Sequence, residues 1–267
     1  MKWKKIGKIL VLDHDPGDLS KFLNELDVDT IIKVNKIRGQ FREPEIELLY
    51  GETTETIHKE NGCLYNLDVS KVMWSKGNTD ERMRIAKLVN DDEIVLDMFA
   101  GIGYFSIPIA IHSNPKKIIS IEINPNSFKY LKKNIILNQV QGKVEPILGG
   151  CENVFKGSDD NYNLNNINLS CEINLSCENA FKDLSFDRII MGYVKTTHYY
   201  LDSAIALLND DGILHYHETV PDKSINTRPI SRIMEIAKGK DVKLLNIRNI
   251  KRYSPGVSHV VLDVKIS

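Results

Sequence analysis

From about residue 93 the chain alternates short apolar runs with longer amphipathic stretches. Short apolar runs bounded by turn residues are typical of buried strands, and the stretches between them are long enough for helices. Strands are expected at 94–99, 117–122, 144–148, 186–191 and 212–217, and helices at 83–89, 105–111, 125–138 and 200–208. Because strands that alternate with helices usually pair in parallel, this region predicts an α/β fold with a mostly parallel sheet and helices on both faces.

The first 70 residues have a different pattern. Apolar runs at 6–12 and 30–34 and a mixed span at 46–51 predict a small α+β module. We therefore divide the chain into an N-terminal domain, 1–70, and a larger domain, 71–267.

The larger domain contains an Asn-rich insertion at about 156–182. The hexapeptide Ile-Asn-Leu-Ser-Cys-Glu occurs at 167–172 and again at 173–178. A six-residue duplication is too short to be a solenoid unit, so we interpret the segment as a low-complexity surface insertion. The alternative is a loop that grips RNA.

The composition is that of a folded protein, with 42% hydrophobic and 27% charged residues, which excludes a globally disordered chain. No apolar run reaches the roughly 18 residues of a membrane-spanning helix, so no membrane association is expected. The four cysteines, Cys63, Cys151, Cys171 and Cys177, form no CxxC pair, which argues against a zinc ribbon. Scattered thiols without a secretion signal predict a reduced, cytoplasmic protein.

The ends of the first two expected strands carry candidate chemistry. Asp97 precedes the glycine turn of Gly101 and Gly103, and Glu122 ends the next strand. Glycines let the backbone approach a ligand closely, although Ser106 replaces the third glycine of a dinucleotide fingerprint. A carboxylate at the second strand end can accept hydrogen bonds from both ribose hydroxyls. This pattern resembles the S-adenosylmethionine site of class I methyltransferase-like (Rossmann-like) enzymes. The alternative is a plain tight turn beside an exposed Glu.

Five further segments occur in a distinctive order: 54–62 (Thr-Glu-Thr-Ile-His-Lys-Glu-Asn-Gly), 71–78 (Lys-Val-Met-Trp-Ser-Lys-Gly-Asn), 97–104 (Asp-Met-Phe-Ala-Gly-Ile-Gly-Tyr), 190–194 (Ile-Met-Gly-Tyr-Val) and 214–219 (Leu-His-Tyr-His-Glu-Thr). Together they resemble the archaeal tRNA wybutosine-synthesising aminocarboxypropyltransferases, relatives of the tRNA guanine-37 N1-methyltransferases. The resemblance covers most of 30–260, apart from the insertion. It implies transfer of the 3-amino-3-carboxypropyl group of S-adenosylmethionine to C7 of 4-demethylwyosine at position 37 of tRNA-Phe, which releases methylthioadenosine.

The resemblance also implies a site. The residues expected to contact the cofactor are Ser75, Arg82, Asp97, Phe99, Gly101, Glu122, Ile123, Gly150, Cys151 and Met191. Relatives often have an Asp at the position of Gly150, and an Asp there can accept a hydrogen bond from the adenine amino group. Because Gly150 has no side chain to do so, backbone groups or Glu152 would have to take this role. Tyr193, His215 and His217 are expected to face the substrate, since ligands bind at the carboxyl ends of parallel strands. No catalytic base is singled out.

Two departures separate the possible reactions. Met191-Gly192-Tyr193 lacks the amide or carboxylate that N-methyltransferases often place after the fourth strand. Ser75-Lys76-Gly77 stands where N1-methyltransferase relatives carry an Asn-Pro-Arg-like stretch. Both favour aminocarboxypropyl transfer to carbon. The alternatives are a tRNA guanine-37 N1-methyltransferase and a catalytically silent module that binds cofactor or RNA. His215 and His217 share a strand face but lack a third clear ligand, so no metal is expected.

The net charge of −1 excludes a uniformly basic protein but not a tRNA enzyme, because residues 186–267 carry 12 basic and 9 acidic side chains. The N-terminal domain is expected to contact tRNA or substrate, and the partner is the anticodon region of tRNA-Phe, bound by a monomer. The alternative for these cations is a set of ordinary solvated faces. The expected phosphate contacts are Arg228, Arg232, Lys238, Lys240, Lys243, Arg248, Lys251 and Arg252, extended by Lys2, Lys4, Lys5, Lys8, Lys33, Lys36, Arg38 and Arg42.

Overall fold

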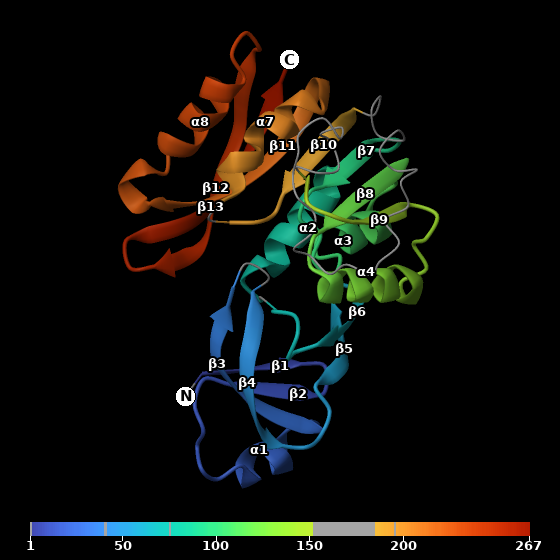
Figure 1. Cartoon of the computed structure of the whole chain (residues 1–267), viewed down its shortest axis with the longest axis vertical. Helices are drawn as coiled ribbons and strands as arrows, with labels where there is room; N and C mark the ends of the chain where they lie inside the picture. The colour runs from blue at the N-terminus through green and yellow to red at the C-terminus, as the bar shows by residue number, and fades with distance from the viewer. Residues whose placement is uncertain (1, 40–41, 75, 152–184, 195) are drawn as a thin grey trace, which may run out of the picture.

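The computed structural model describes residues 2–39, 42–74, 76–151, 185–194 and 196–267. The predicted insertion at about 156–182 therefore lies outside the described residues, and so do Ser75 and Glu152. The described part of the chain has a small N-terminal sheet, a large C-terminal sheet and a hairpin between them (Figure 1).

The N-terminal sheet has the strand order β1-β2-β3-β4. Its strands are β1 (Trp3–Ile6), β2 (Ile9–Leu12), β3 (Thr30–Arg38) and β4 (Glu43–Tyr50). The helix α1 (Ser20–Glu25) lies in the crossover between the parallel strands β2 and β3 and packs Phe22 into a small core with Leu10, Leu12 and Ile31. The expected small α+β unit at the start of the chain is therefore confirmed.

The hairpin of β5 (Glu55–Glu60) and β6 (Cys63–Asp68) packs against α4 (Pro125–Leu137). Leu64 N donates a hydrogen bond to Asn138 Oδ1 at 2.8 Å, and Asn66 N donates to Asn134 Oδ1 at 2.7 Å. The hairpin thus lies before residue 70 in the sequence but packs against α4, a helix that covers the large sheet. The boundary at residue 70 stays a prediction.

Within the described residues the large sheet contains seven strands in the order β12-β13-β11-β10-β7-β8-β9. They are β7 (Ile94–Asp97), β8 (Lys117–Glu122), β9 (Val144–Leu148), β10 (Phe186–Met191), β11 (Leu208–Pro221), β12 (Val242–Ser254) and β13 (Val257–Ile266). The neighbouring strands β9, β8, β7, β10 and β11 run parallel to one another. The strand β13 pairs antiparallel with both of its neighbours, β11 and β12. The strands β8 and β9 are added on one side of β7, and the following strands β10 and β11 on its other side. Open α/β sheets bind ligands at the point where the strand order reverses in this way.

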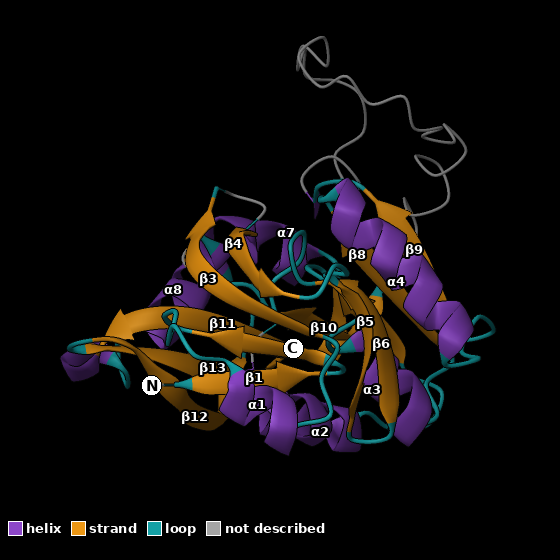
Figure 2. Cartoon of the chain, turned by 90° about the horizontal axis from the view of Figure 1, so that it is seen from below, coloured by secondary structure: helices purple, strands orange, loops and turns teal. Residues whose placement is uncertain are grey.

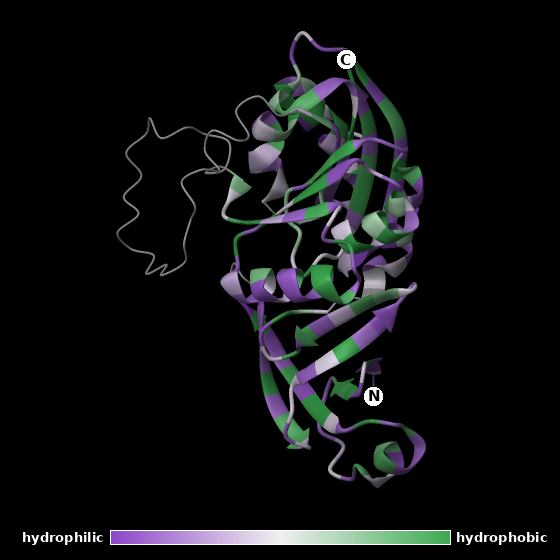
Figure 3. Cartoon of the chain, turned by 90° about the vertical axis from the view of Figure 1, so that its right-hand side faces the viewer, coloured by the Kyte–Doolittle hydropathy of each residue, from purple (hydrophilic) through white to green (hydrophobic). Residues whose placement is uncertain are grey.

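Helices cover both faces of the large sheet, as expected. One core joins Val95 to α2 (Thr79–Leu88), α3 (Ser106–His112) and α4, and a second joins Leu96 to α7 (Leu201–Ala206) and α8 (Arg228–Ile236). Figure 2 shows α8 and α2 on opposite sides of β11. Figure 3 shows hydrophobic residues concentrated along the strands between these layers. Short 3-10 turns precede α2, α7 and α8 at η1 (Lys76–Asn78), η3 (Thr197–Tyr200) and η4 (Asp222–Ser224).

The expected strands at 117–122, 144–148 and 186–191 are confirmed with the same bounds. The strand expected at 212–217 is longer at both ends, and the helix expected from residue 83 begins at Thr79. The antiparallel pair β12 and β13 was not expected. Most of β12 is exposed on the sheet edge, including Leu244 and Leu245, so it lacks the alternation that identifies a half-buried strand.

A buried charge network joins α2 to three strands of the large sheet. Arg188 Nη1 of β10 lies 2.7 Å from His215 Nε2 of β11, and His215 Nδ1 lies 2.6 Å from Asp263 Oδ1 of β13. Because a guanidinium can only donate, His215 Nε2 must accept, and the neutral imidazole donates from Nδ1 to Asp263. Burial lowers the pKa of His215, which agrees with the neutral form.

Asp263 also accepts hydrogen bonds from Arg84 of α2, at 2.5 Å and 2.9 Å. Burial acts to raise the pKa of Asp263, but the hydrogen bonds from His215 and Arg84 outweigh it and hold the pKa below its usual range. A carboxyl whose pKa falls on folding stabilises the folded state at neutral pH, and this contribution is lost as pH falls through its folded pKa.

We expect Asp263→Asn to lower the free energy of unfolding at pH 7 by about 3 kcal/mol, because Arg84 and His215 lose a buried anionic partner. Urea titration measures this change. The difference from the parent chain should shrink below about pH 4, where the unfolded carboxyl is protonated. As a control, Glu145→Gln removes an exposed pair with Lys117 and should cost less than about 1 kcal/mol. Equal losses in the two variants would contradict a special role for the network.

Candidate active site

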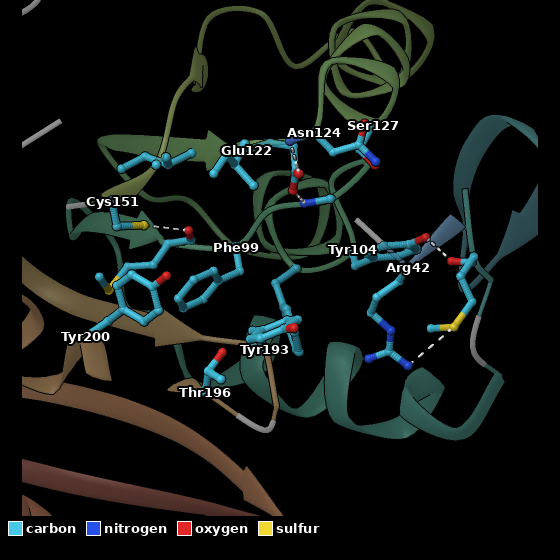
Figure 4. A pocket seen from close by; sticks show the side chains of 18 of the residues that line it. Arg42, Phe99, Tyr104, Glu122, Asn124, Ser127, Cys151, Tyr193, Thr196 and Tyr200 are labelled. Atoms are coloured by element: carbon cyan, nitrogen blue, oxygen red, sulfur yellow. Dashed lines mark hydrogen bonds between the residues drawn. The ribbon is translucent and has the colours of Figure 1, made fainter. Parts of the chain in front are cut away.

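A cavity of about 630 Å³ opens at the carboxyl ends of β7, β8, β9 and β10. Further parts of its wall come from the loop between β3 and β4, from the segment before α2 together with Arg82 of that helix, and from η3 with the residue before it. Figure 4 shows side chains from these elements around one common space. The volume is within the range of small-molecule sites, and the position is the ligand crevice of an open α/β sheet.

The turn after β7 forms the floor of the cavity. Gly101 has a φ of +59°, and a Cβ added there would lie 2.6 Å from the Tyr104 ring. Asn134 Nδ2 fixes the turn by donating to Ile102 O at 2.9 Å. Only glycine fits both the backbone conformation and the space at residue 101, so the turn leaves its backbone accessible to a ligand.

Glu122 ties this turn to the end of β8. Its two carboxylate oxygens accept hydrogen bonds from Gly101 N and Asn124 N, both at 2.7 Å. Burial raises the pKa of Glu122 to about 7. Each oxygen retains a second lone pair toward the cavity, so an ionised Glu122 can also accept hydrogen bonds from two neighbouring hydroxyls of a ligand.

Asp97 lies beneath the turn and is fully buried. Its Oδ2 accepts a hydrogen bond from Ser106 Oγ at 2.7 Å, and its Oδ1 has no hydrogen-bond partner among the described residues. Burial raises the pKa of Asp97 to about 6. Asp97 does not line the cavity, so its direct contribution is to the support of the turn.

Beyond Glu122, the cavity wall is formed by the end of β9. Gly149 and Gly150 line it with backbone, and Cys151 Sγ donates to Met98 O at 2.8 Å. On the β7 and β10 side, the Phe99 ring centroid lies 5.6 Å from that of Tyr193 and 5.2 Å from that of Tyr200. This part of the cavity offers aromatic faces and backbone groups, which suit a flat heterocycle.

Arg82 of α2 forms part of the opposite wall. Its guanidinium lies 4.6 Å from the centroid of Trp74 and 4.8 Å from that of Tyr104, and its Nη1 pairs with Glu60 Oε1 at 2.6 Å. Trp74 and the guanidinium are almost fully buried. The hairpin therefore fixes the orientation of Arg82 through Glu60, and two aromatic rings hold its plane.

Most of the expected cofactor residues line the cavity. These are Arg82, Phe99, Gly101, Glu122, Ile123, Gly150 and Cys151, together with the expected substrate residue Tyr193. Met191 is fully buried and, like Asp97, does not line it. The placement of Ser75 lies outside the described residues.

The two histidines expected to face the substrate do not line the cavity. His215 is fully buried in the charge network, and His217 Nδ1 lies 3.0 Å from His259 Nε2. The reason is that β11 continues to Pro221 and pairs along its length with β13, so both histidines lie inside the sheet instead of at its carboxyl end. His217 packs against Phe105, which does line the cavity.

The structure adds lining residues that the sequence analysis did not place at the site, among them Asn78, Tyr104, Asn124 and Tyr200. It also brings Arg42, which was expected only as a phosphate contact, into the lining. Tyr104 directly follows the glycine turn, and Asn124 precedes Pro125 as an N-cap, so both carried a local signal. Arg42 comes from the N-terminal sheet, and nothing in its local sequence indicates that it reaches this cavity.

The histidines, cysteines and carboxylates of the described ranges form no group of three or more that could hold a metal ion. Among the helices of the described residues, none is long and apolar enough to cross a membrane.

Part of the expected phosphate-binding surface is engaged inside the chain. Arg228 and Arg232 pair with the buried Glu218.

Residues 56–161 and 155–245 match the family model described as the TRM5/TYW2 methyltransferase domain. A tRNA(Phe) (4-demethylwyosine(37)-C(7)) aminocarboxypropyltransferase of Methanocaldococcus jannaschii is 42% identical, over 99% of this chain and 98% of the relative. A tRNA (guanine(37)-N(1))-methyltransferase Trm5b of Pyrococcus abyssi is 35% identical, over 88% of this chain and 63% of the relative.

Solved structures agree. M. jannaschii TYW2 in complex with AdoMet superimposes with a TM-score of 0.74 at 38% identity, covering 100% of this chain and 99% of that one. P. horikoshii TYW2 in complex with MeSAdo has a TM-score of 0.78 at 36% identity, covering 99% of this chain and 90% of that one. The chain therefore belongs to the TRM5/TYW2 family, among its archaeal aminocarboxypropyltransferases.

Proposed function

We propose that the chain transfers the 3-amino-3-carboxypropyl group of S-adenosylmethionine to C7 of 4-demethylwyosine at position 37 of tRNA-Phe and releases methylthioadenosine. The M. jannaschii relative named for this reaction is similar over almost the whole of both chains. Relatives have been solved with AdoMet and with MeSAdo, the substrate and product expected of this transfer. In this proposal the chain acts as a cytoplasmic monomer on the anticodon region of the tRNA.

The residues at the end of β10 favour aminocarboxypropyl transfer over methylation. Gly192 and Tyr193 line the cavity there, and Met191 is buried, so residues 191–193 present no side-chain amide or carboxylate to a ring nitrogen. A Cβ on Gly192 would lie 2.6 Å from the Phe105 ring, so a larger residue does not fit without movement. An electron-rich carbon acceptor needs no such polar partner.

The residues around the cavity divide into two groups by chemistry. Glu122 provides the acceptor for ribose hydroxyls, and Ile123, Gly150 and Cys151 border the space for adenine. When bound, S-adenosylmethionine supplies a sulfonium whose γ-carbon is electrophilic because the sulfur leaves as a neutral thioether. Arg82 and Phe99 line the cavity as the expected cofactor contacts, and the contribution of Tyr193 is to position the acceptor base in line with that carbon.

The reaction is tested with hypomodified tRNA-Phe and S-adenosylmethionine labelled either in the carboxyl group or in the methyl group. The proposal expects the carboxyl label in the RNA, methylthioadenosine as the small product, and a nucleoside heavier by one aminocarboxypropyl group in mass spectrometry. Entry of the methyl label alone would identify an N1-methyltransferase instead. Cofactor binding without either product would identify a silent binding module.

We expect Gly101→Ala to weaken the binding of S-adenosylmethionine by about tenfold or more, because a left-handed backbone and a clash with Tyr104 strain the turn by roughly 1–3 kcal/mol. Isothermal titration calorimetry measures the change. Gly142→Ala is the matched control, since an added Cβ there meets no atom within 4 Å. An unchanged affinity in Gly101→Ala would show that the turn does not contact the ligand.

The affinity for methylthioadenosine should fall about tenfold from pH 8 to pH 6. Glu122 has a pKa of about 7, and its ionised form is the better acceptor for ribose hydroxyls. Methylthioadenosine is the probe because it lacks the titrating amino acid arm. Glu122→Gln should bind about tenfold more weakly at pH 8 and show a flat profile over this range. A slope that survives in Glu122→Gln would assign the titration to another group.

A further inference from the structure

The chain between β10 and α7 forms one side of the cavity. We call the described residues of 193–200 the rim segment. Four of its side chains line the cavity: Tyr193, Thr196, Tyr199 and Tyr200. Figure 4 shows Tyr193 and Thr196 on the side of the cavity away from Glu122. If the ribose of the cofactor lies against Glu122, the rim segment borders the space left for the acceptor.

The backbone of the rim segment is held by hydrogen bonds and by burial. Thr197 is buried, and its Oγ1 donates to Tyr193 O at 2.7 Å. Tyr199 N donates to Thr196 O at 3.0 Å, and Leu201, directly after the segment, is fully buried in the second core. The backbone that carries Tyr199 is therefore set before a ligand binds, which lowers the entropy cost of binding.

Tyr199 differs in its exposure from the other aromatic side chains of the rim segment. Tyr193 and Tyr200 are half-buried and pack against Phe99, whereas Tyr199 is 71% exposed. The centroid of the His198 ring lies 4.1 Å from that of Tyr199, at an interplanar angle of 41°. A single exposed aromatic ring is normal on an ordinary surface, but this one lies at the edge of the candidate active site.

The proposed substrate brings unpaired bases to this place. Position 37 is next to the anticodon, and single-stranded loops of RNA are recognised by bases that unstack and pack on aromatic side chains. Tyr193, half-buried in the cavity wall, is placed to meet the target base. A ring as exposed as that of Tyr199 lies at the mouth, where the neighbouring nucleotide has to pass.

We propose that Tyr199 stacks on the base of a nucleotide that directly flanks the target, at position 36 or 38, while the target base enters the cavity. This inference rests on the proposed function and adds a second base contact to it. The flanking base is favoured over the adenine of the cofactor because the cofactor is expected between the strand ends near Glu122, whereas Tyr199 lies on the rim. Stacking on a neutral ring uses the face of a base and does not depend on its identity.

The first test compares Tyr199→Ala, Tyr199→Leu and Tyr199→Phe in the full chain. The probe is tRNA-Phe assembled from synthetic fragments with guanosine at position 37, and equilibrium binding is measured over a series of salt concentrations. Tyr199→Ala should bind about tenfold more weakly, Tyr199→Leu nearly as weakly because it lacks an aromatic face, and Tyr199→Phe like the parent chain. The slope of log K against log salt should stay unchanged in all three, because no charge is removed.

The second test identifies the base. Three further tRNAs lack the base at position 36, 37 or 38 and keep the backbone intact. Loss of one of the two flanking bases should weaken binding to the parent chain about tenfold and should have little further effect in Tyr199→Ala, because both changes remove the same contact. Loss of the base at position 37 should weaken binding to both proteins by the same factor.

The matched control is Ile136→Ala. Ile136 is 64% exposed on α4 and does not line the cavity, so this variant also removes an exposed apolar side chain. It should bind every tRNA like the parent chain. Thermal unfolding of all variants checks the fold, and calorimetry should give the parent affinities for S-adenosylmethionine and methylthioadenosine in each.

The outcomes are distinguishable. Unchanged tRNA affinity in Tyr199→Ala, or full affinity in Tyr199→Leu, would overturn the proposal. Coupling of Tyr199→Ala to the base at position 37 would assign the ring to the target base instead, and weaker methylthioadenosine binding would assign it to the cofactor. A chain that shows the expected tRNA binding but transfers no aminocarboxypropyl group would leave this inference standing and remove the proposed function.

Discussion

The cavity depends on the carboxylate of Glu122. Its two hydrogen bonds to Gly101 N and Asn124 N join the turn after β7 to the start of α4, and they keep the ends of β7 and β8 at a fixed separation. Both donors are backbone groups, so among side chains only the rotamer of Glu122 itself controls the two bonds. Glu122 also lines the cavity, so the carboxylate that fixes the turn is the same group that would contact the ligand.

A second constraint is the connection between the two parts of the chain. The hairpin positions Arg82 through Glu60 and is itself fixed to α4 by Asn134 and Asn138. The N-terminal sheet reaches the same region through Lys4 and Arg42. The wall of the cavity around Arg82 is thus assembled from elements distant in sequence, whereas the wall around Glu122 comes from consecutive strand ends.

This difference explains what could be predicted from the sequence. Apolar runs in the sequence identify the strands β7, β8 and β9, and parallel strands end at the same edge of a sheet. The sequence could therefore predict that the residues at these strand ends lie together, namely Phe99, Gly101, Glu122 and Cys151. His215 was placed wrongly because periodicity does not show that β11 continues past residue 217 or that β13 pairs beside it. Arg42 required the docking of the N-terminal sheet, which local sequence does not encode.

The clamp around Arg82 has a spectroscopic consequence. The chain has two tryptophans: Trp74 is 2% exposed, in contact with Arg82, Tyr65 and Tyr104, and Trp3 is 50% exposed on β1. The indole of Trp74 therefore lies in a dry, charged environment one residue layer from the cavity. With Trp3 replaced by Phe, the tryptophan fluorescence would come from Trp74 alone and would report the electric field of the site.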